Sequence, residues 1–424
     1  MLNRKTPPPI VDAVNFNLQL KPYTKFTLKN GIDVYTVNAG AEDVMAIEWV
    51  FFAGNSYEEQ NLVAASANFL LKNGTSQRSA FQINEHFDYY GSYLNRACYN
   101  ETAVLSLHCL TRHIGELLPV VRELLTDSVL PQDELDIYKQ NMKQRLKVNL
   151  KKGDFVAGRL IDSYLYGEEH PYGKFSHNED FDKLQRDELV KFYKEYYQQG
   201  KLIMFAAGRL PNNLEELFNQ YFGDLANNKV DSVQHLVKPA TEKKYRIIND
   251  ENNVQGSIRL ARPFHNRHHP DFLKAMVLNN LFGGYFGSRL MSNIREDKGY
   301  TYGIHSYLQN HVETSAWMVS TEAGKEVTEA TIAEVYKEMK LLCEEPVDEE
   351  ELLLVRNYMM GSILGELDGP FQIIARWKNI ILNNLDENYF YDSINTIKKV
   401  TAEELQEMAQ KYLKPEHFYE LVVI

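Results

Sequence analysis

The sequence predicts an α+β fold of two homologous domains, each a mainly antiparallel sheet covered by helices on one face. One observation is an internal repeat offset by about half the chain, because "LPQDELDIYKQNMKQRL" from Leu130 recurs in pattern as "EPVDEEELLLVRNYMMGSIL" from Glu345. Similarly, "LQRDELVKFYKEYY" from Leu184 recurs as "VTAEELQEMAQKYL" from Val400, and a short apolar strand follows each helix. The order of elements agrees, since strands precede long helices in both halves.

The first half opens with strands. Apolar residues alternate on both sides of Asn30-Gly31, a strong two-residue turn signal that predicts a hairpin. The run "VMAIEWVFFAG" adds a strand, and "ETAVLSLHCL" adds another. Alternation in the last of these places Leu105 and Leu107 on one face and His108 on the other.

Helices follow from about His113, Gln132, Asp154 and Gln185. An earlier helix, "EQNLVAASANFLLKNGT", is expected to end at Gly74 and to bury four residues at helical spacing, Leu62, Ala65, Phe69 and Leu70. The polar stretch "LANNKVDSVQHLVKPATEKK" is typical of a linker. We therefore expect domains at residues 1–224 and 244–424, joined by a linker at 225–243.

Composition excludes several classes of partner. Lys+Arg 46 against Asp+Glu 58 gives a net charge of −12, which disfavours nucleic acid because its phosphates are neutralised by basic residues. Apolar runs such as "LIMFAAG" are too short to span a bilayer, and "MLNRKTPPPI" lacks the apolar stretch of a secretory signal. We expect no membrane partner, a cytoplasmic location and three reduced cysteines.

The stretch "GSRLMSNIREDKGYTYG" at 287–303 concentrates charged and aromatic residues directly after the loop "LFGGYF". Taken by itself, Arg295 is a cation in the last turn of a helix that Gly299 ends in the left-handed conformation, and Tyr302 is a core aromatic. The loop lacks the G-K-[ST] of a nucleotide-binding loop, so its glycines can simply form a turn.

The joint placement of these segments resembles the pitrilysin, insulysin and mitochondrial processing peptidase family, the inverted zinc metallopeptidases, over almost the whole chain. In that family the helix ending at "GT" carries H-x-x-E-H, whose histidines bind zinc and whose glutamate is the general base. Aligned from Gly74-Thr75, these positions fall on Ala65, Asn68 and Phe69. Alanine and phenylalanine cannot bind zinc, and the amide of asparagine cannot act as a carboxylate base.

The third zinc ligand of the family is a glutamate on the long helix downstream, yet this chain has no glutamate between Glu134 and Glu168. No H-x-x-E-H occurs anywhere in the 424 residues. Other histidines are interpreted as non-ligands, namely His113 near Glu116, His170, and the pair His268 and His269. We expect no metal in this chain and no activity of the chain alone, since zinc supplies the activated water.

The resemblance implies that Arg295 and Tyr302 hold the substrate backbone and the oxyanion in a partner's site, while Gly283, Gly284, Gly287 and Ser288 bind substrate. The chain is then the non-zinc subunit of a heterodimeric metallopeptidase that binds extended peptides, and only its homologous H-x-x-E-H partner holds zinc. One alternative is a catalytically inactive structural or peptide-binding homologue. Another is an active zinc peptidase with unrecognised ligands.

Overall fold

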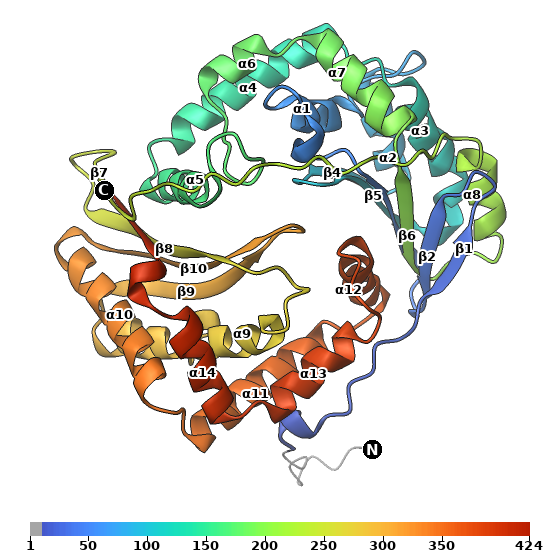
Figure 1. The fold of residues 1–424 in the computed structure, drawn as a ribbon. Helices are drawn as coiled ribbons and strands as arrows, with labels where there is room; N and C mark the ends of the chain where they lie inside the picture. Colours follow the sequence, from blue (N-terminus) through green and yellow to red (C-terminus); the bar gives the residue numbers. More distant parts are fainter. Residues whose placement is uncertain (1–10) are drawn as a thin grey trace. The chain divides into compact units, whose positions relative to one another are not determined.

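The computed structural model describes residues 11–424, which form two compact units with one sheet each (Figure 1). The N-terminal unit comprises residues 21–241 together with 369–379. The C-terminal unit comprises residues 11–20, 242–368 and 380–424. The expected ranges 1–224 and 244–424 do not anticipate that residues 369–379 join the first unit, and the assignment of domains to these ranges stays a prediction.

The N-terminal unit contains a six-stranded sheet in the order β1-β2-β6-β3-β5-β4. Only β2 and β6 are parallel neighbours, so the sheet is mainly antiparallel as predicted. The hairpin turns through Asn30-Gly31, where Gly31 has φ +84° and Leu28 N–H bonds Ile32 O at 2.9 Å. Its strands are β1 (Thr24–Thr27), β2 (Asp33–Asn38), β3 (Val44–Phe51), β4 (Tyr93–Cys98), β5 (Ala103–Leu110) and β6 (Leu202–Gly208).

Helices cover the face of this sheet that carries Met45, Ile47, Trp49 and Phe51, all of them buried in the core. Four of them begin within one residue of the starts predicted near His113, Gln132, Asp154 and Gln185. The helices are α1 (Val63–Leu70), α2 (Ala80–Tyr89), α3 (Ile114–Asp127), α4 (Gln132–Asn149), α5 (Gly153–Tyr166), α6 (Asn178–Lys183), α7 (Arg186–Phe192), continued by the π-helical η4 (Tyr193–Gln198), and α8 (Leu214–Phe222).

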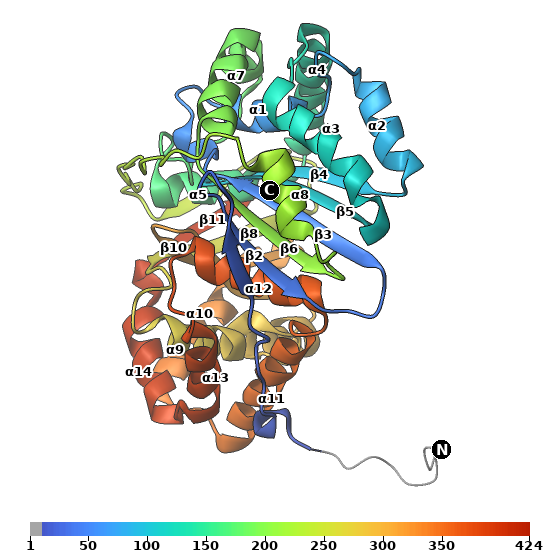
Figure 2. The same ribbon diagram turned by 90° about the vertical axis from the view of Figure 1, so that its right-hand side faces the viewer.

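The other face of the same sheet is met by α12 (Pro370–Leu382), a helix from the second half of the chain (Figures 1 and 2). Trp377 Nε1 donates to the carbonyl oxygen of Lys21 at 2.8 Å, and Lys378 Nζ lies 2.5 Å from Glu48 Oε2 on β3. Because β-strand side chains alternate, Glu48 lies on the face opposite Ile47 and Trp49. The sequence did not predict this cover.

The C-terminal unit repeats the topology of the N-terminal unit. Its five strands run in the order β7-β11-β8-β10-β9, which matches β2-β6-β3-β5-β4, and again only the first pair is parallel. This correspondence confirms the fold class of two homologous α+β halves. The strands are β7 (Lys244–Ile247), β8 (Gln255–Phe264), β9 (Thr301–Asn310), β10 (Ser315–Gly324) and β11 (Tyr419–Val423).

Helices of the C-terminal unit include two π-helical segments that precede β9: one contains the start of the glycine loop, and the other follows this loop. The elements are α9 (Phe272–Asn279), the π-helical η5 (Asn280–Gly284) and η6 (Met291–Asp297), α10 (Thr328–Glu344), α11 (Glu349–Gly365), α13 (Tyr389–Lys399) and α14 (Ala402–Tyr412). Short 3₁₀ turns supplement the helices of both units. None of the helices in the described residues is long and apolar enough to cross a bilayer.

The predicted core face of α1 is wrong. Phe69 is 37% exposed, and Leu62 and Ala65 are only half-buried, whereas Leu70 is fully buried as expected. The core is instead contacted by Val63, Ala64, Ala67, Leu70 and Leu71. Since α1 is apolar on nearly all sides, its composition does not fix which side faces the core. The helix also ends at Leu70, four residues before Gly74.

Candidate functional site

The positions that align with the zinc motif lie on α1, where Asn68 and Phe69 contact neighbouring side chains. Asn68, in the place of the general base, is buried and donates from Nδ2 to the hydroxyl of Tyr197 at 3.1 Å. Phe69, in the place of the second histidine, turns toward solvent, and Ala65 lies one turn before it. Asn68 is thus a structural amide in the helix packing.

Two residues from other elements fill the space around Phe69. The ring of Tyr138 on α4 lies 4.6 Å from the ring of Phe69, and the guanidinium carbon of Arg96 on β4 lies 4.2 Å from the same ring. Burial lowers the pKa of Arg96 to about 10. Across residues 11–424, no group of three or more His, Cys, Asp or Glu side chains is arranged to hold a metal ion.

The start of α1 is held by the carboxylate of Glu58. It accepts hydrogen bonds from the N–H groups of Leu62 at 3.2 Å and Ala64 at 2.8 Å, and Lys174 Nζ lies 2.6 Å away. Burial raises the pKa of Glu58, and the charge of Lys174 opposes that rise. A carboxylate at a helix N-terminus favours the helix, so α1 keeps its position without a metal.

The structure places Arg295 and Tyr302 in contact. The guanidinium carbon of Arg295 lies 5.7 Å from the ring centroid of Tyr302 and 4.6 Å from that of Phe286. Tyr302 is 94% exposed, so it is not a core aromatic. Its hydroxyl makes no hydrogen bond within the described part of the chain. The Arg295 side chain is 29% exposed and lies 3.9 Å from a Glu296 oxygen, too far for a strong ion pair.

The backbone explains why these two side chains meet. Arg295 lies in the last turn of η6, and Gly299 then adopts φ +65°, a conformation that favours glycine. The chain enters β9, an edge strand, whose register with β10 is interrupted opposite Tyr302. Such a bulge re-aims side chains at the end of a strand. The segment η6 is tied to α10, because Lys298 Nζ lies 3.4 Å from Glu334 Oε1.

The four residues of the predicted glycine-loop site divide into two groups. Gly283 is buried, and a Cβ there would lie 2.7 Å from Ser306 Cβ, so this glycine permits close packing of η5 on β9. Ser288 is 1% exposed. Gly284 is half-buried and Gly287 is exposed, and none of the three glycines has a positive φ. A peptide can therefore contact Gly284 and Gly287, while Gly283 and Ser288 are enclosed.

The glycine loop is fixed to α11 by two contacts. Arg289 forms two hydrogen bonds to the carboxylate of Glu351, both at 2.8 Å. The ring of Tyr285 stacks on that of Tyr358 at 4.5 Å. Paired hydrogen bonds of this kind fix direction as well as distance. Phe286, between these anchors, is 60% exposed and is held where it contacts Arg295.

The remaining histidines make structural contacts. His170 is buried against Tyr172, with their ring centroids 4.7 Å apart, and burial lowers its pKa. His113 lies 5.1 Å from the ring of Tyr90. His268 is within 2.9 Å of the carbonyl oxygen of Asn383 through Nε2.

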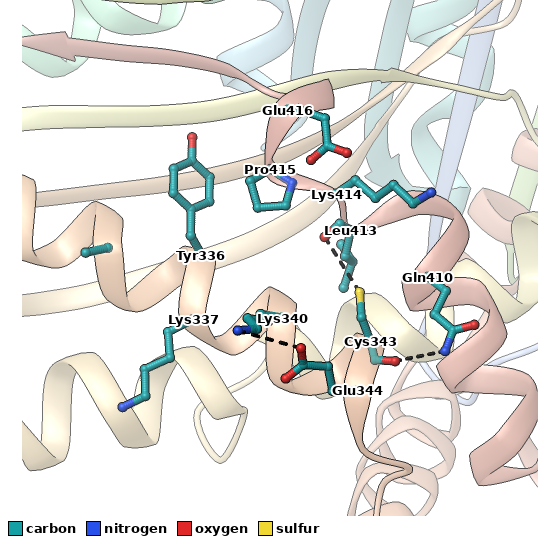
Figure 3. A pocket seen from close by; sticks show the side chains of 11 residues that line it. Tyr336, Lys337, Lys340, Cys343, Glu344, Gln410, Leu413, Lys414, Pro415 and Glu416 are labelled. Carbon is teal, nitrogen blue, oxygen red and sulfur yellow. Dashed lines mark hydrogen bonds and ion pairs between the residues drawn. The ribbon is translucent and has the colours of Figure 1, made fainter.

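A cavity of about 700 Å³ lies between α10 and the end of α14, lined in part by Tyr336, Lys340, Cys343 and Leu413 (Figure 3). Gln410 Nε2 donates to the carbonyl oxygen of Cys343 at 2.9 Å. Burial raises the pKa of the Cys343 thiol, which disfavours the reactive thiolate. None of the site residues predicted from the sequence lines this cavity.

Comparison with known proteins shows similarity to M16 peptidases in both sequence and fold. A family model described as "Peptidase M16 inactive domain" matches residues 183–359. The "Uncharacterized zinc protease YmxG" of Bacillus subtilis is 23% identical over 409 residues, 94% of this chain and 97% of that protein. A Pseudomonas fluorescens structure titled as a peptidase M16 inactive domain is 22% identical, with TM-score 0.84 over 95% of this chain and 98% of that chain.

The chain is thus similar to M16 peptidases, and its residues 183–359 match the model of their inactive domain. Two further relatives carry different names. The "Non-peptidase homolog YmxG" of Helicobacter pylori is 21% identical over 374 residues, 86% of this chain and 85% of that protein. The "Probable mitochondrial-processing peptidase subunit beta" of Schizosaccharomyces pombe is 23% identical over 308 residues, 69% and 67% of the two chains. Together with the missing zinc motif, these findings are consistent with an inactive homologue of M16 peptidases.

Sequence reasoning missed three residues around these M16 sites: Arg96, Tyr138 and Phe286. Phe286 lies inside the quoted glycine loop, so its neighbourhood was a signal. Arg96 and Tyr138 lie on a different strand and helix from the zinc motif, and no local pattern links them to it.

Proposed function

We propose that this chain is the non-zinc subunit of a heterodimeric M16 metallopeptidase, which binds an extended peptide and supplies Arg295 and Tyr302 to the zinc site of a homologous subunit. The observation that carries the proposal is the contact of these two side chains at an exposed surface, combined with Phe69, Tyr138 and Arg96 in place of the zinc motif. A scaffold has no need to keep two hydrogen-bond donors together in solvent.

The chemistry follows from the donors. A guanidinium and a phenol can both donate to one carbonyl oxygen, and donors aimed at a developing oxyanion typically contribute about 10²- to 10³-fold in rate. In the partner subunit, zinc lowers the pKa of its bound water to about 7. Tyr302 is the second residue of the edge strand β9, and extended peptides can add to such an edge through main-chain hydrogen bonds. Gly284 and Gly287 leave the neighbouring backbone accessible.

The relatives support this proposal and also its main alternative. One relative is named as a subunit of a processing peptidase, which supports a two-subunit assembly. The names "inactive domain" and "non-peptidase homolog" equally favour a catalytically inactive structural or peptide-binding protein. The name "zinc protease" of another relative suits an active zinc peptidase with unrecognised ligands, but no group of three metal-binding side chains occurs among residues 11–424.

Co-purification with a homologue bearing H-x-x-E-H, sought first in the neighbouring reading frame, tests the proposal. The mixture should cleave peptides while each chain alone does not. Arg295→Ala in this chain should lower kcat/KM of the mixture by about 10²-fold or more, and Tyr302→Phe by a smaller factor. Arg209→Ala is the control, because Arg209 is an exposed arginine of the other unit.

The alternatives predict different results. If the two chains form a complex whose rate is unchanged by Arg295→Ala, the structural role is correct and the catalytic contribution is wrong. Stoichiometric zinc in the purified chain, with peptide cleavage by that chain alone, would support the active peptidase.

A further inference from the structure

Two cations lie together between the end of α1 and the edge strand β4. Lys72 Nζ donates to the carbonyl oxygen of Leu94 at 3.3 Å. Two residues along β4, Arg96 Nη2 lies 3.5 Å from Oδ1 of Asn73, the residue after Lys72. Because α1 and β4 are neighbours, both positive groups lie where the end of this helix meets the edge strand.

Neither cation has a counter-ion among residues 11–424. The carboxylate of Glu134 is used by Asn73, whose Nδ2 donates to it at 2.6 Å. Burial and the charge of Arg96 lower the pKa of Lys72, and Asp88 opposes this only in part. Arg96 Nε is enclosed and has no acceptor in the described residues. When two like charges lie side by side and partly out of water, each raises the free-energy cost of burying the other.

The site is open on one side. Arg96 is half-buried, and Phe69, whose ring lies against the guanidinium, is 37% exposed, so the site borders solvent. The rings of Phe69 and Tyr138 contact each other at a tilt of 36°, and the guanidinium lies over the ring of Phe69. Next to the position that aligns with the zinc motif, the chain thus presents a planar cation.

We propose that Arg96 and Lys72 bind a carboxylate of the peptide, so that the chain selects substrates with an acidic side chain or a free C-terminus near this point. The inference rests on the proposed function of peptide binding and names its substrate class. A carboxylate matches the planar fork of arginine with two oxygens. A peptide paired to the edge strand β4 would direct alternate side chains toward the face that carries Arg96.

The experiment uses the full chain and three pentapeptides at constant ionic strength. The probes are acetyl-Val-Thr-Glu-Thr-Val-amide, the same peptide with Gln in place of Glu, and the Gln peptide with a free C-terminal carboxylate. Binding is followed by calorimetry and by the NMR signal of the Arg96 Nε–H group. The Glu peptide should bind about 10- to 100-fold more tightly than the amidated Gln peptide, the range expected for a hydrogen bond to a charged group.

Arg96→Gln should remove this preference, and Arg159→Gln is the matched control. Arg159 also stacks on a phenylalanine, with its guanidinium carbon 4.3 Å from the ring of Phe175, but it donates to the carbonyl oxygen of Ser176. Preference for the free C-terminus over the amide would identify the terminal carboxylate as the ligand, and preference for Glu would identify the side chain.

Equal binding of all three peptides, or a preference that survives Arg96→Gln, would overturn this inference while leaving peptide binding intact. Absence of binding in every arm would overturn the inference and count against the peptide-binding part of the proposed function. Loss of the Arg295 effect on the paired enzyme is a separate result and concerns only the catalytic role.

Discussion

Arg96→Met should stabilise the chain, because it removes a half-buried guanidinium that has no counter-ion. Burial lowers the pKa of Arg96 from 12.5 to about 10, which corresponds to about 3 kcal/mol against the charged form in the folded state. The cation–π contact with Phe69 stabilises the charged form in the folded state by about 1–2 kcal/mol. The hydrogen bond to Asn73, at 3.5 Å, contributes little. Methionine keeps apolar contact with the ring, so the net gain should be about 1–2 kcal/mol.

Urea unfolding at pH 7.5 measures this change as a higher midpoint at unchanged slope. Arg159→Met is the control, since this arginine stacks on Phe175 and also donates to Ser176 O at 2.5 Å. Its loss should leave an acceptor without a donor and lower the midpoint. A midpoint that falls with Arg96→Met by as much as with Arg159→Met would refute the reasoning, because Arg96 would then be a stabilising packing residue.

Three further predictions concern buried groups. His170 accepts a hydrogen bond from the N–H of Tyr172 at 3.1 Å, and burial lowers its pKa, so His170 takes up a proton in the unfolded chain before it does so in the folded chain. Between pH 7 and pH 5 the free energy of unfolding should therefore fall more in the wild type than in His170→Phe. Gly283→Ala should lower the free energy of unfolding by about 1–3 kcal/mol, because the added methyl group overpacks against β9. Gly361→Ala adds a methyl group in open space on α11 and should raise the free energy of unfolding by about 0.5–1 kcal/mol. Urea midpoints measure both changes, and equal shifts would contradict the packing argument. Burial raises the pKa of Cys98 to about 12 and so disfavours the reactive thiolate. At pH 8, iodoacetamide should therefore modify Cys98 at least about 100-fold more slowly in the folded chain than in urea, as measured by mass spectrometry. Equal rates would show that the Cys98 thiol is not buried.

Much of the fold could be predicted because the signals were local or repeated. The turn at Asn30-Gly31 and the alternation in β5 depend on neighbouring residues, and both hold in the structure. The internal repeat predicted two similar halves, and the two sheets indeed share one strand order. The prediction of which face of α1 is buried was wrong, because a helix with apolar residues on most sides can pack through several faces. Contacts with elements such as β4, α4 and α7 determine which face is buried.

In the candidate site, too, features set by local sequence could be predicted and features set by tertiary contacts could not. The absence of zinc ligands at Ala65 and Phe69 follows from residue types and needs no coordinates. The residues that fill the space come from strands and helices far along the chain, as Tyr138 and Arg96 do, so no spacing rule could connect them. The packing of α12 on the second face of the N-terminal sheet was missed for the same reason.

The degenerate zinc position is a rebuilt structure, which matters for how activity could return. Histidines at Ala65 and Phe69 would still lack an acidic third ligand, and a divalent ion bound there would face the positive charge of Arg96 next to Phe69. A glutamate at Asn68 would be buried beside the Tyr197 hydroxyl, where its charge would be costly. Recovery therefore requires coordinated changes on α1, α4 and β4. Under the proposed function, Arg295 and Tyr302 would contribute to catalysis only at a zinc site on another chain.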